Sequence, residues 1–366
     1  MFFTTERADL LEAVSRLQRV VGAKTTMPVL EGILISAEQG KATLIAYNLE
    51  MGLKKEIYAN CKKEGDIVIN ARLLADILRR LNGNVVEIET DDRLNCHIKC
   101  GEATFDIVGM AATDFPEMPS VAEGNSISIE ADIMADMIKT TIFAAATAEG
   151  AKPILTGINF SVENSFLTIV GIDGFRLAIR KEKVNETKDI EFTVSNKSVA
   201  EVLRLIDEES EKVEINVGNR LISFNINGYS FISRVIEGEF VNYRKTLPET
   251  HKQRIVINTR DLINIIERVS LLISDNFSTP IRCYFNELNV VFTCATSVGR
   301  ATETFNIQLE GENFEIGLNS RYLLDSLRAI EDEKIQILFN GSNAGILMLP
   351  LEGESFKYMI MPMRLK

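Results

Sequence analysis

The 366-residue chain is poor in the residues that build disulfide frameworks, metal sites and membrane spans. Its five cysteines are odd in number and mostly isolated, which argues against a disulfide framework. With only two histidines in the chain, a four-ligand metal site around Cys96, His97 and Cys100 is short of ligands. No apolar run is long enough to span a membrane, and the first residues lack a basic start followed by an apolar segment. We therefore expect a soluble cytoplasmic protein with no metal and no other cofactor.

The chain also lacks an excess of positive charge. It has 40 Lys and Arg residues against 52 Asp and Glu residues, which gives a formal net charge of −12. Proteins that bind nucleic acid through its phosphates usually concentrate Lys and Arg, so this balance argues against a simple basic binder. It describes the sum of the charges and not their distribution. The hydrophobic content of 46 % and the absence of low-complexity tracts predict a folded chain, and the length predicts two or three domains.

What the sequence does contain is a unit repeated six times, with a period of roughly sixty residues. In each copy a short strand leads through a polar or small residue into an amphipathic helix. The six helical segments are expected at 8–14, 71–77, 131–137, 197–203, 260–266 and 321–327. Five of the leading strands are expected at 67–70, 127–130, 192–195, 255–258 and 316–319.

Alternating apolar and polar runs follow the helices and predict antiparallel strands. The clearest breaks in the pattern of strands and helices come after every second unit, at Asp114-Phe115-Pro116, at Asn242-Tyr243-Arg244 and near the end of the chain. We therefore predict an α+β fold of three repeated domains, at residues 1–120, 126–247 and 252–366. Each domain is expected to pack two helices on antiparallel sheets.

The segment Ile169–Ile179 lies near the middle of the chain and reads as a strand, a tight turn at Asp173-Gly174 and a second strand. Phe175, Arg176 and Leu177 then place an aromatic ring, a guanidinium and an isobutyl group next to one another. They are expected to form one wall of a hydrophobic groove with a charged lip. An ordinary hairpin, with Phe175 and Leu177 in the core, is the alternative.

Together, the duplicated units, Asp173-Gly174-Phe175-Arg176-Leu177, Met27-Pro28-Val29-Leu30 and the terminal Met361-Pro362-Met363-Arg364-Leu365 resemble the bacterial sliding clamps, the beta subunits of DNA polymerase III. The resemblance covers the whole chain in order. It implies a head-to-tail homodimeric ring of six similar domains, with helices lining the hole. Helix spacing agrees with two copies, because six helices enclose only about 8 Å whereas twelve leave roughly 26 Å for duplex DNA.

The resemblance also implies partners: duplex DNA bound without regard to sequence, a clamp loader, the replicative polymerase and other proteins that dock through short linear motifs. These motifs carry a glutamine and two large apolar side chains. The corresponding pocket maps onto Lys152, Leu155, Gly157, Ile172, Gly174, Phe175, Arg176, Leu177, Val241, Thr246, Met359, Met361, Pro362, Met363 and Arg364. Flexible methionines are suited to repacking around different clients, and Arg176 and Arg364 are expected to donate to peptide carbonyls.

This sequence departs from the family pattern at the pocket. Ile172 stands where threonine is usual, Phe175 where histidine or another polar aromatic residue is usual, and Val241 where proline is common, while Lys366 adds a charged residue to the tail. These changes make the expected pocket more apolar and bear on which clients it prefers.

By the same resemblance, the dimer interface joins Phe105 and Ile107 to Leu272 and Ile273. Alternatively, Leu272 and Ile273 end a helix and face its own core. The residues expected to face DNA are Lys24, Arg72, Arg79, Arg80, Lys139, Lys152, Lys197, Arg204, Arg244, Arg268 and Arg282, each of which is otherwise an ordinary surface charge.

Two other functions compete with this interpretation. An enzyme would use Asp173 and Arg176 in a central cleft, but the sequence offers no nucleophile paired with a base, no phosphate loop and no metal set, so we expect no catalytic residues. A repeat-built scaffold that binds peptides without encircling DNA would share the pocket and differ only in the hole.

Overall fold

The computed structural model describes residues 1–22, 26–121, 125–147, 150–186, 188–273 and 279–365. The chain divides into two compact units. Unit 1 comprises Met1–Asp132 and Ala200–Val235, and unit 2 comprises Ile133–Val199 and Ile236–Lys366. Each unit therefore combines two segments that are distant in sequence. The divisions after residues 132 and 199 fall inside helices.

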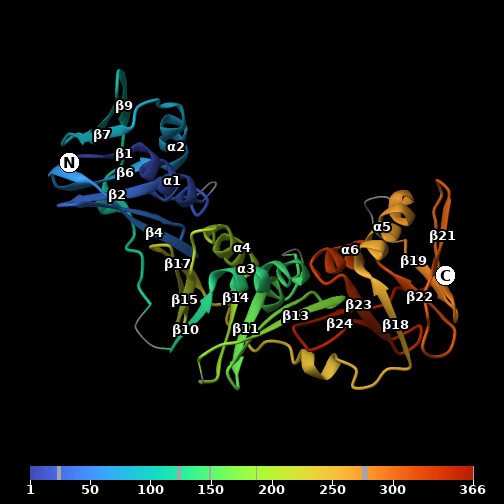
Figure 1. Ribbon diagram of the computed structural model, residues 1–366. Coiled ribbons are helices and arrows are strands. Elements are labelled where there is room, and N and C mark those ends of the chain that lie inside the picture. Colours follow the sequence, from blue (N-terminus) through green and yellow to red (C-terminus); the bar gives the residue numbers. More distant parts are fainter. Residues whose placement is uncertain (23–25, 122–124, 148–149, 187, 274–278, 366) are drawn as a thin grey trace. The chain divides into compact units, whose positions relative to one another are not determined.

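The six predicted helical segments are confirmed (Figure 1). Three of the helices begin after an asparagine whose side chain accepts hydrogen bonds from the first turn, namely Asn70, Asn258 and Asn319. The helices are α1 (Arg7–Leu17), α2 (Ala71–Arg80), α3 (Ala131–Lys139), α4 (Asn196–Leu205), α5 (Thr259–Val269) and α6 (Ser320–Arg328). Short 3-10 helices are η1 (Pro28–Glu31), η2 (Ala112–Asp114), η3 (Ile142–Ala144), η4 (Pro153–Thr156), η5 (Tyr243–Thr246) and η6 (Ser270–Leu272).

Unit 1 contains two antiparallel sheets. The five-stranded sheet has the order β5 (Asn60–Lys63), β1 (Phe2–Glu6), β7 (Val85–Thr90), β8 (Asn95–Cys100) and β9 (Ala103–Val108). The eight-stranded sheet has the order β10 (Asn125–Glu130), β15 (Lys212–Val217), β16 (Leu221–Ile226), β17 (Tyr229–Arg234), β4 (Met51–Tyr58), β3 (Lys41–Tyr47), β2 (Gly32–Glu38) and β6 (Gly65–Asn70).

Unit 2 repeats this plan. Its eight-stranded sheet has the order β14 (Ile190–Ser195), β11 (Gly157–Glu163), β12 (Phe166–Ile172), β13 (Arg176–Lys183), β25 (Phe356–Ile360), β24 (Ile346–Pro350), β23 (Lys334–Phe339) and β18 (Gln253–Asn258). Its smaller sheet has the order β21 (Arg300–Asn306), β20 (Asn289–Ala295), β19 (Ile281–Phe285) and β22 (Phe314–Leu318). Each eight-stranded sheet continues across one predicted domain boundary, because β4 pairs with β17 and β13 pairs with β25.

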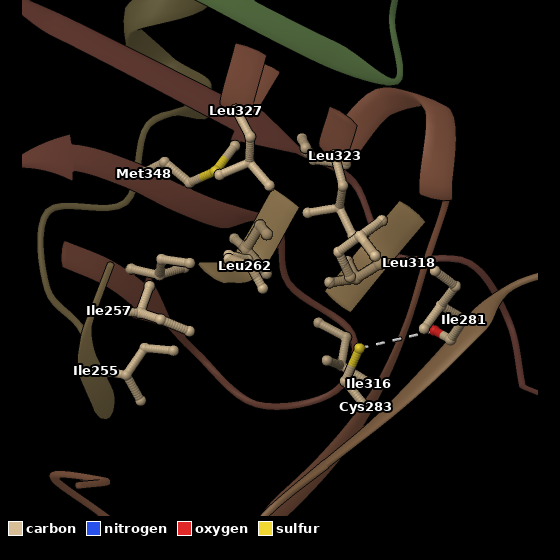
Figure 2. Packing of buried hydrophobic residues seen from close by; sticks show 14 of the residues in the cluster. Ile255, Ile257, Leu262, Ile281, Cys283, Ile316, Leu318, Leu323, Leu327 and Met348 are labelled. Atoms are coloured by element: carbon tan, nitrogen blue, oxygen red, sulfur yellow. Dashed lines mark hydrogen bonds between the residues drawn. The ribbon is translucent and has the colours of Figure 1, made fainter. Parts of the chain in front are cut away.

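The main core of unit 2 lies between the helices α5 and α6 and its two sheets (Figure 1). Figure 2 shows Leu262 from α5 and Leu323 and Leu327 from α6 packed with side chains from the strands. The Cys283 thiol in this core points to the carbonyl oxygen of Ile281 at 3.9 Å. Burial raises the pKa of that thiol, so Cys283 is an inert core residue.

The predicted central hairpin is also confirmed. Strands β12 and β13 pair in antiparallel register from Phe166↔Lys183 to Ile172↔Leu177. Gly174 has a φ of +90°, a conformation that favours glycine, and Asp173 Oδ1 accepts the N–H groups of Phe175 and Arg176. The Asp-Gly pair therefore sets the turn as the sequence predicts.

Candidate functional site

The eight-stranded sheet of unit 2 carries buried apolar residues on both faces. Its inner face is covered by the main core, which includes Ala178 of β13. The neighbouring residues Leu177 and Ile179 point to the other face, because side chains alternate along a strand. There they join a second cluster, called here the outer cluster, whose buried members are Val170, Ile172, Leu177, Ile179, Phe240, Tyr243, Leu347 and Met359.

Strand register explains why the outer cluster is apolar at one end and polar at the other. Its first row runs across the sheet through Ile172, Leu177, Met359 and Leu347, which are cross-strand neighbours. Two residues further along β12 and β13, Val170 pairs with Ile179, and after another two, Thr168 pairs with Lys181. The polar end opens into a cavity of about 510 Å³ that shares Ile179, Tyr243 and Leu247 with the cluster.

Several of the residues predicted for the pocket meet in this cluster. Ile172, Leu177 and Met359 are buried members, and Leu155 is partly buried against them. Tyr243, at the start of η5, is a buried member of the cluster. Thr246 ends η5, and the Thr246 hydroxyl donates to the Tyr243 carbonyl at 2.6 Å. Residues from three distant parts of the chain thus form one apolar surface.

The C-terminal methionines divide between two places. Both Met359 Sδ and Met361 Sδ lie 3.2 Å from where a Cβ on Gly345 would stand, so a larger residue there would displace them. Met361 N donates to Phe175 O at 2.8 Å, which ties the tail to the central turn. Beyond Pro362, Met363 instead bridges to Gly317 of β22. Arg364 lines a separate cavity of about 430 Å³ beside β19 and β20, together with Arg282 and Thr293.

Arg176 does not form the predicted charged lip. Its side chain is 9 % exposed and is engaged by the carboxylates of Asp173, at 3.0 Å, and Asp325, at 2.5 Å. Asp325 belongs to α6, which covers the inner face of the sheet. The interpretation that Arg176 and Leu177 both face a client is wrong, because adjacent strand residues point to opposite faces.

The remaining predicted pocket residues lie around the edge of the outer cluster or apart from it. Phe175 is 61 % exposed and stacks on Tyr322, and Val241 and Met361 are each 38 % exposed. Lys152 is exposed just before η4, and Gly174 is exposed in the turn. Gly157 is buried where β11 meets β14, since a Cβ there would meet Val194 O at 2.7 Å.

Sequence reasoning missed most of the outer cluster. Leu347 and Leu349 of β24, Leu338 of β23, and the linker residues Phe240 and Leu247 were not predicted. A signal for them was present. Strands β12, β13, β24 and β25 carry consecutive apolar residues instead of alternating ones, which is the pattern of a sheet buried on both faces.

A larger cavity, of about 840 Å³, occupies the matching place in unit 1, but its chemistry differs. The cross-strand row Asn216, Ser223, Ile232, Gly52 in unit 1 takes the place of Leu338, Leu347, Met359, Leu177 in unit 2. The amide of Asn216 and the hydroxyl of Ser223 make that row more polar than its counterpart, although Leu34, Ile45, Phe115 and Met118 also line the cavity. Size therefore does not decide the candidate site; the apolar row in unit 2 does.

Most of the predicted DNA-facing residues are exposed on or beside helices. The exposed members on helices are Arg72, Arg79 and Arg80 of α2, Lys139 of α3, Lys197 and Arg204 of α4, and Arg268 of α5. Lys152, just before η4, is also exposed. Some are paired with acids, as Arg79 is with Asp76 at 3.1 Å and Arg204 is with Glu201. Lys24 lies outside the residues that the structure describes.

Arg244 and Arg282 belong to a different surface. Arg244 lines the cavity at the polar end of the outer cluster, on the sheet face opposite to the helices. There Glu163 accepts from it at 2.8 Å, and this hydrogen bond raises the pKa of the guanidinium. Arg282 lies between the core residues Ile281 and Cys283, so it also points away from the helices. The expectation that these two arginines share the helix surface is wrong.

The predicted interface residues lie at or near sheet edges. Strand β9 is the edge of its sheet, with Phe105 37 % and Val108 77 % exposed and Ile107 half-buried. Leu272 and Ile273 are half-buried and pack against the main core of unit 2, as the alternative interpretation held. The four-stranded sheet of unit 2 has its own edge strand, β21, which the sequence analysis did not single out.

No metal site is found among the residues that the structure describes. The three residues that suggested one lie on two faces of β8: Cys96 and Cys100 are buried, whereas His97 is exposed and contacts Asp106 at 2.5 Å. Within the same residues, no helix is long and apolar enough to cross a membrane.

Comparisons with known proteins identify the family. Models of the N-terminal, central and C-terminal domains of the DNA polymerase III beta subunit match residues 1–119, 128–242 and 244–364. The beta sliding clamps of Bacillus subtilis and Halalkalibacterium halodurans are 29 % and 28 % identical to the chain, over the full length of both proteins in each case.

Solved structures agree. The sliding clamp of Bacillus subtilis superposes with a TM-score of 0.96 at 27 % identity, and the DNA polymerase III beta subunit of Pseudomonas aeruginosa with 0.95 at 26 %. Each comparison covers 100 % of both chains. With all three domain models in order and full-length likeness in fold, the chain belongs to the DNA polymerase III beta subunit family, the bacterial sliding clamps.

Proposed function

We propose that two copies of this chain close into a ring around duplex DNA and tether the replicative polymerase and other replication proteins through the outer cluster of unit 2. The chain has no catalytic role in this proposal. It keeps its partners at the DNA while they act, and a clamp loader opens the ring to admit the DNA. The observation that carries the proposal is the apolar row of Ile172, Leu177 and Met359 on a sheet face away from the helices.

The outer cluster suits the large apolar side chains of a short linear motif. Its floor is buried and rigid because it belongs to strands, while Met359 and Met361 supply flexible side chains. The exposed Phe175, Val241 and Met361 surround it with apolar surface. A docked side chain therefore gains apolar contacts and leaves no buried charge unpaired.

The helix surface suits loose contact with DNA. Arg72, Arg80 and Lys197 are exposed on helices, where phosphates can reach them. Acidic neighbours such as Asp76 and Glu201 moderate the positive charge. A ring that holds DNA topologically and still slides requires this balance, since tight neutralisation of phosphates would oppose movement.

The edge strand β9 supports closure of the ring. An edge strand offers unpaired N–H and C=O groups, and its exposed Phe105 and Val108 add apolar surface. We propose that β9 of one copy meets the region of Leu272, Ile273 and β21 in the other, which would extend two sheets across the interface.

Retention on circular DNA tests the proposal. The protein is loaded with a clamp loader and ATP on nicked circular DNA and washed in high salt, and the circle is then cut. Release on cutting, with retention before it, is the expected result. Binding that disappears in high salt and does not respond to cutting would contradict encirclement. Retained peptide binding together with loss of the topological link would favour the alternative, a peptide-binding scaffold.

A further inference from the structure

The Arg176 guanidinium is enclosed on the helix side of the unit 2 sheet. Its Nε donates to Asp173 Oδ2 at 3.0 Å and its Nη1 donates to Asp325 Oδ2 at 2.5 Å. It also lies over the Tyr322 and Phe143 rings, with distances of 4.5 and 5.5 Å to the ring centroids. A cation this deeply enclosed is stable only while its carboxylate partners remain in place.

The two carboxylates have different consequences. Asp173 belongs to the same turn as Arg176 and also accepts the N–H groups of Phe175 and Arg176, so it organises the turn internally. Asp325 lies 149 residues further along the chain, on α6. Of the two carboxylates, Asp325 is therefore the one that fixes this turn to the helix layer.

The Asp173–Arg176 turn also holds the C-terminal tail, which borders the outer cluster. The Phe175 carbonyl accepts the N–H of Met361 at 2.8 Å, and Arg176 pairs with Ile360 in the β13–β25 ladder. The Phe175 ring stacks on Tyr322 of α6, with centroids 6.4 Å apart. Movement of α6 relative to the turn would therefore shift Phe175 and Met361, two exposed side chains at the edge of the cluster.

We infer that Asp325 is a positioning residue for the client site: from the opposite face of the sheet, it sets the place of Phe175 and Met361 by holding Arg176. The inference rests on the proposed docking of clients at the outer cluster. Asp325 itself contacts no client, because it belongs to the helix layer and its partners are Arg176 and Arg321. Without the negative charge of Asp325, the Arg176 guanidinium would leave its enclosed place for solvent. This movement would pull the turn out of register with the tail.

The test compares three substitutions, Asp325→Ala, Asp325→Asn and Asp325→Glu, in the full-length protein. One measurement is the affinity of a synthetic peptide that carries a glutamine and two large apolar residues. The other is hydrogen exchange of the Met361 N–H in the protein without peptide. We expect Asp325→Ala to weaken peptide binding about tenfold and to speed this exchange about tenfold, since a buried charged hydrogen bond is lost. Asp325→Asn should change the peptide affinity and the exchange rate by smaller factors. Asp325→Glu should return both to wild-type values.

Glu267→Gln provides a matched control. Glu267 of α5 accepts from Arg328, also a residue of α6, at 2.7 Å, but this pair is exposed and links α6 to α5 instead of to the turn. The substitution removes one ion pair to α6 and should change neither measurement.

The two measurements separate the inference from the proposed function. If the wild-type protein binds no peptide and Asp325→Ala still speeds Met361 exchange, docking fails and the positioning role stands. If a folded Asp325→Ala variant keeps both the affinity and the exchange rate of the wild type, the inference is overturned. Should Asp325→Ala not fold, Asp325→Asn decides instead, and wild-type values in both measurements overturn the inference.

Discussion

Leu177 and Met359 lie opposite each other where β13 pairs with β25, and they are 1 % and 7 % exposed. The two residues come from the central and C-terminal domains of the family, so the outer cluster exists only because one sheet continues from one domain into the next. Any change at this pair should affect both the stability of unit 2 and the proposed client site.

Leu177→Ala tests that expectation. Removal of a fully buried isobutyl group should lower the free energy of unfolding by about 2–4 kcal/mol and widen the floor of the cluster. Peptide affinity should fall in the same variant. Chemical denaturation and peptide titration measure the two effects. Ile169→Val, on the opposite face of β12, is the control: a modest loss of stability with unchanged peptide affinity is expected. Equal peptide affinity in Leu177→Ala and the wild type would contradict docking at this row.

Phe105→Asp tests the ring interface. A charge in the exposed edge strand β9 should oppose pairing with a second copy, because the partner would have to cover an unpaired carboxylate. Native mass spectrometry should then find a species near 40.9 kDa, whereas the wild type should be twice as heavy. Tyr58→Asp, which changes an exposed aromatic residue on β4, should keep the dimer. A dimeric Phe105→Asp protein would place the interface elsewhere.

Basic residues on the helix surface and basic residues that point away from the helices should differ in their effect on DNA binding. Replacing Arg79 and Arg80 with alanine should weaken direct DNA binding and reduce the slope of log affinity against log salt by about 1–2, as about 0.9 is lost per phosphate contact. The matched pair Arg244→Ala and Arg282→Ala should leave the slope unchanged, because those side chains point away from the helices. Equal effects from both pairs would argue against a helix-lined DNA surface.

His97 should titrate above its ordinary range. Its hydrogen bond with Asp106 raises the pKa of the imidazole. A pKa raised by folding contributes stability below the unfolded value of about 6.5, and that contribution is lost as the pH rises through the folded value. An NMR titration of the His97 ring should show a midpoint above 6.5 that falls in Asp106→Asn. A midpoint that does not respond to this substitution would exclude the pair as its cause.

Asp207→Asn tests an ion pair that joins α1 to the segment after α4 in unit 1. Arg16 Nη2 donates to Asp207 Oδ2 at 2.7 Å. Burial raises the pKa of Asp207, but hydrogen bonds from Arg16 and Ser210 outweigh it, so the net shift is downward. The pair therefore stabilises the fold above the unfolded pKa of about 3.9, and this is lost as the pH falls through the folded value. The variant should be about 1 kcal/mol less stable at pH 7, and denaturation midpoints should converge in acid.

The sequence alone determined the repeated architecture. Helix positions followed from 3.6-residue periodicity and from the polar or small residue before each helix, and the central turn followed from Asp173-Gly174, because all of these signals are local. The resemblance to sliding clamps supplied the family, which the comparisons confirm, and it pointed to Leu177 and Met359.

Only the tertiary structure decided which face of a sheet each side chain occupies. Strand register and the continuation of one sheet across two domains assign Leu177 to the outer cluster and Arg176 to Asp325. Alternation along β19 turns Arg282 away from the helix surface. The 3-10 helix η5 carries Arg244 on the sheet face opposite to the helices and brings Tyr243 into the outer cluster beside Leu347. The assignments of Leu177 and Arg176 depend on contacts between residues more than a hundred positions apart, and no local pattern of apolar and polar residues records which strands become neighbours.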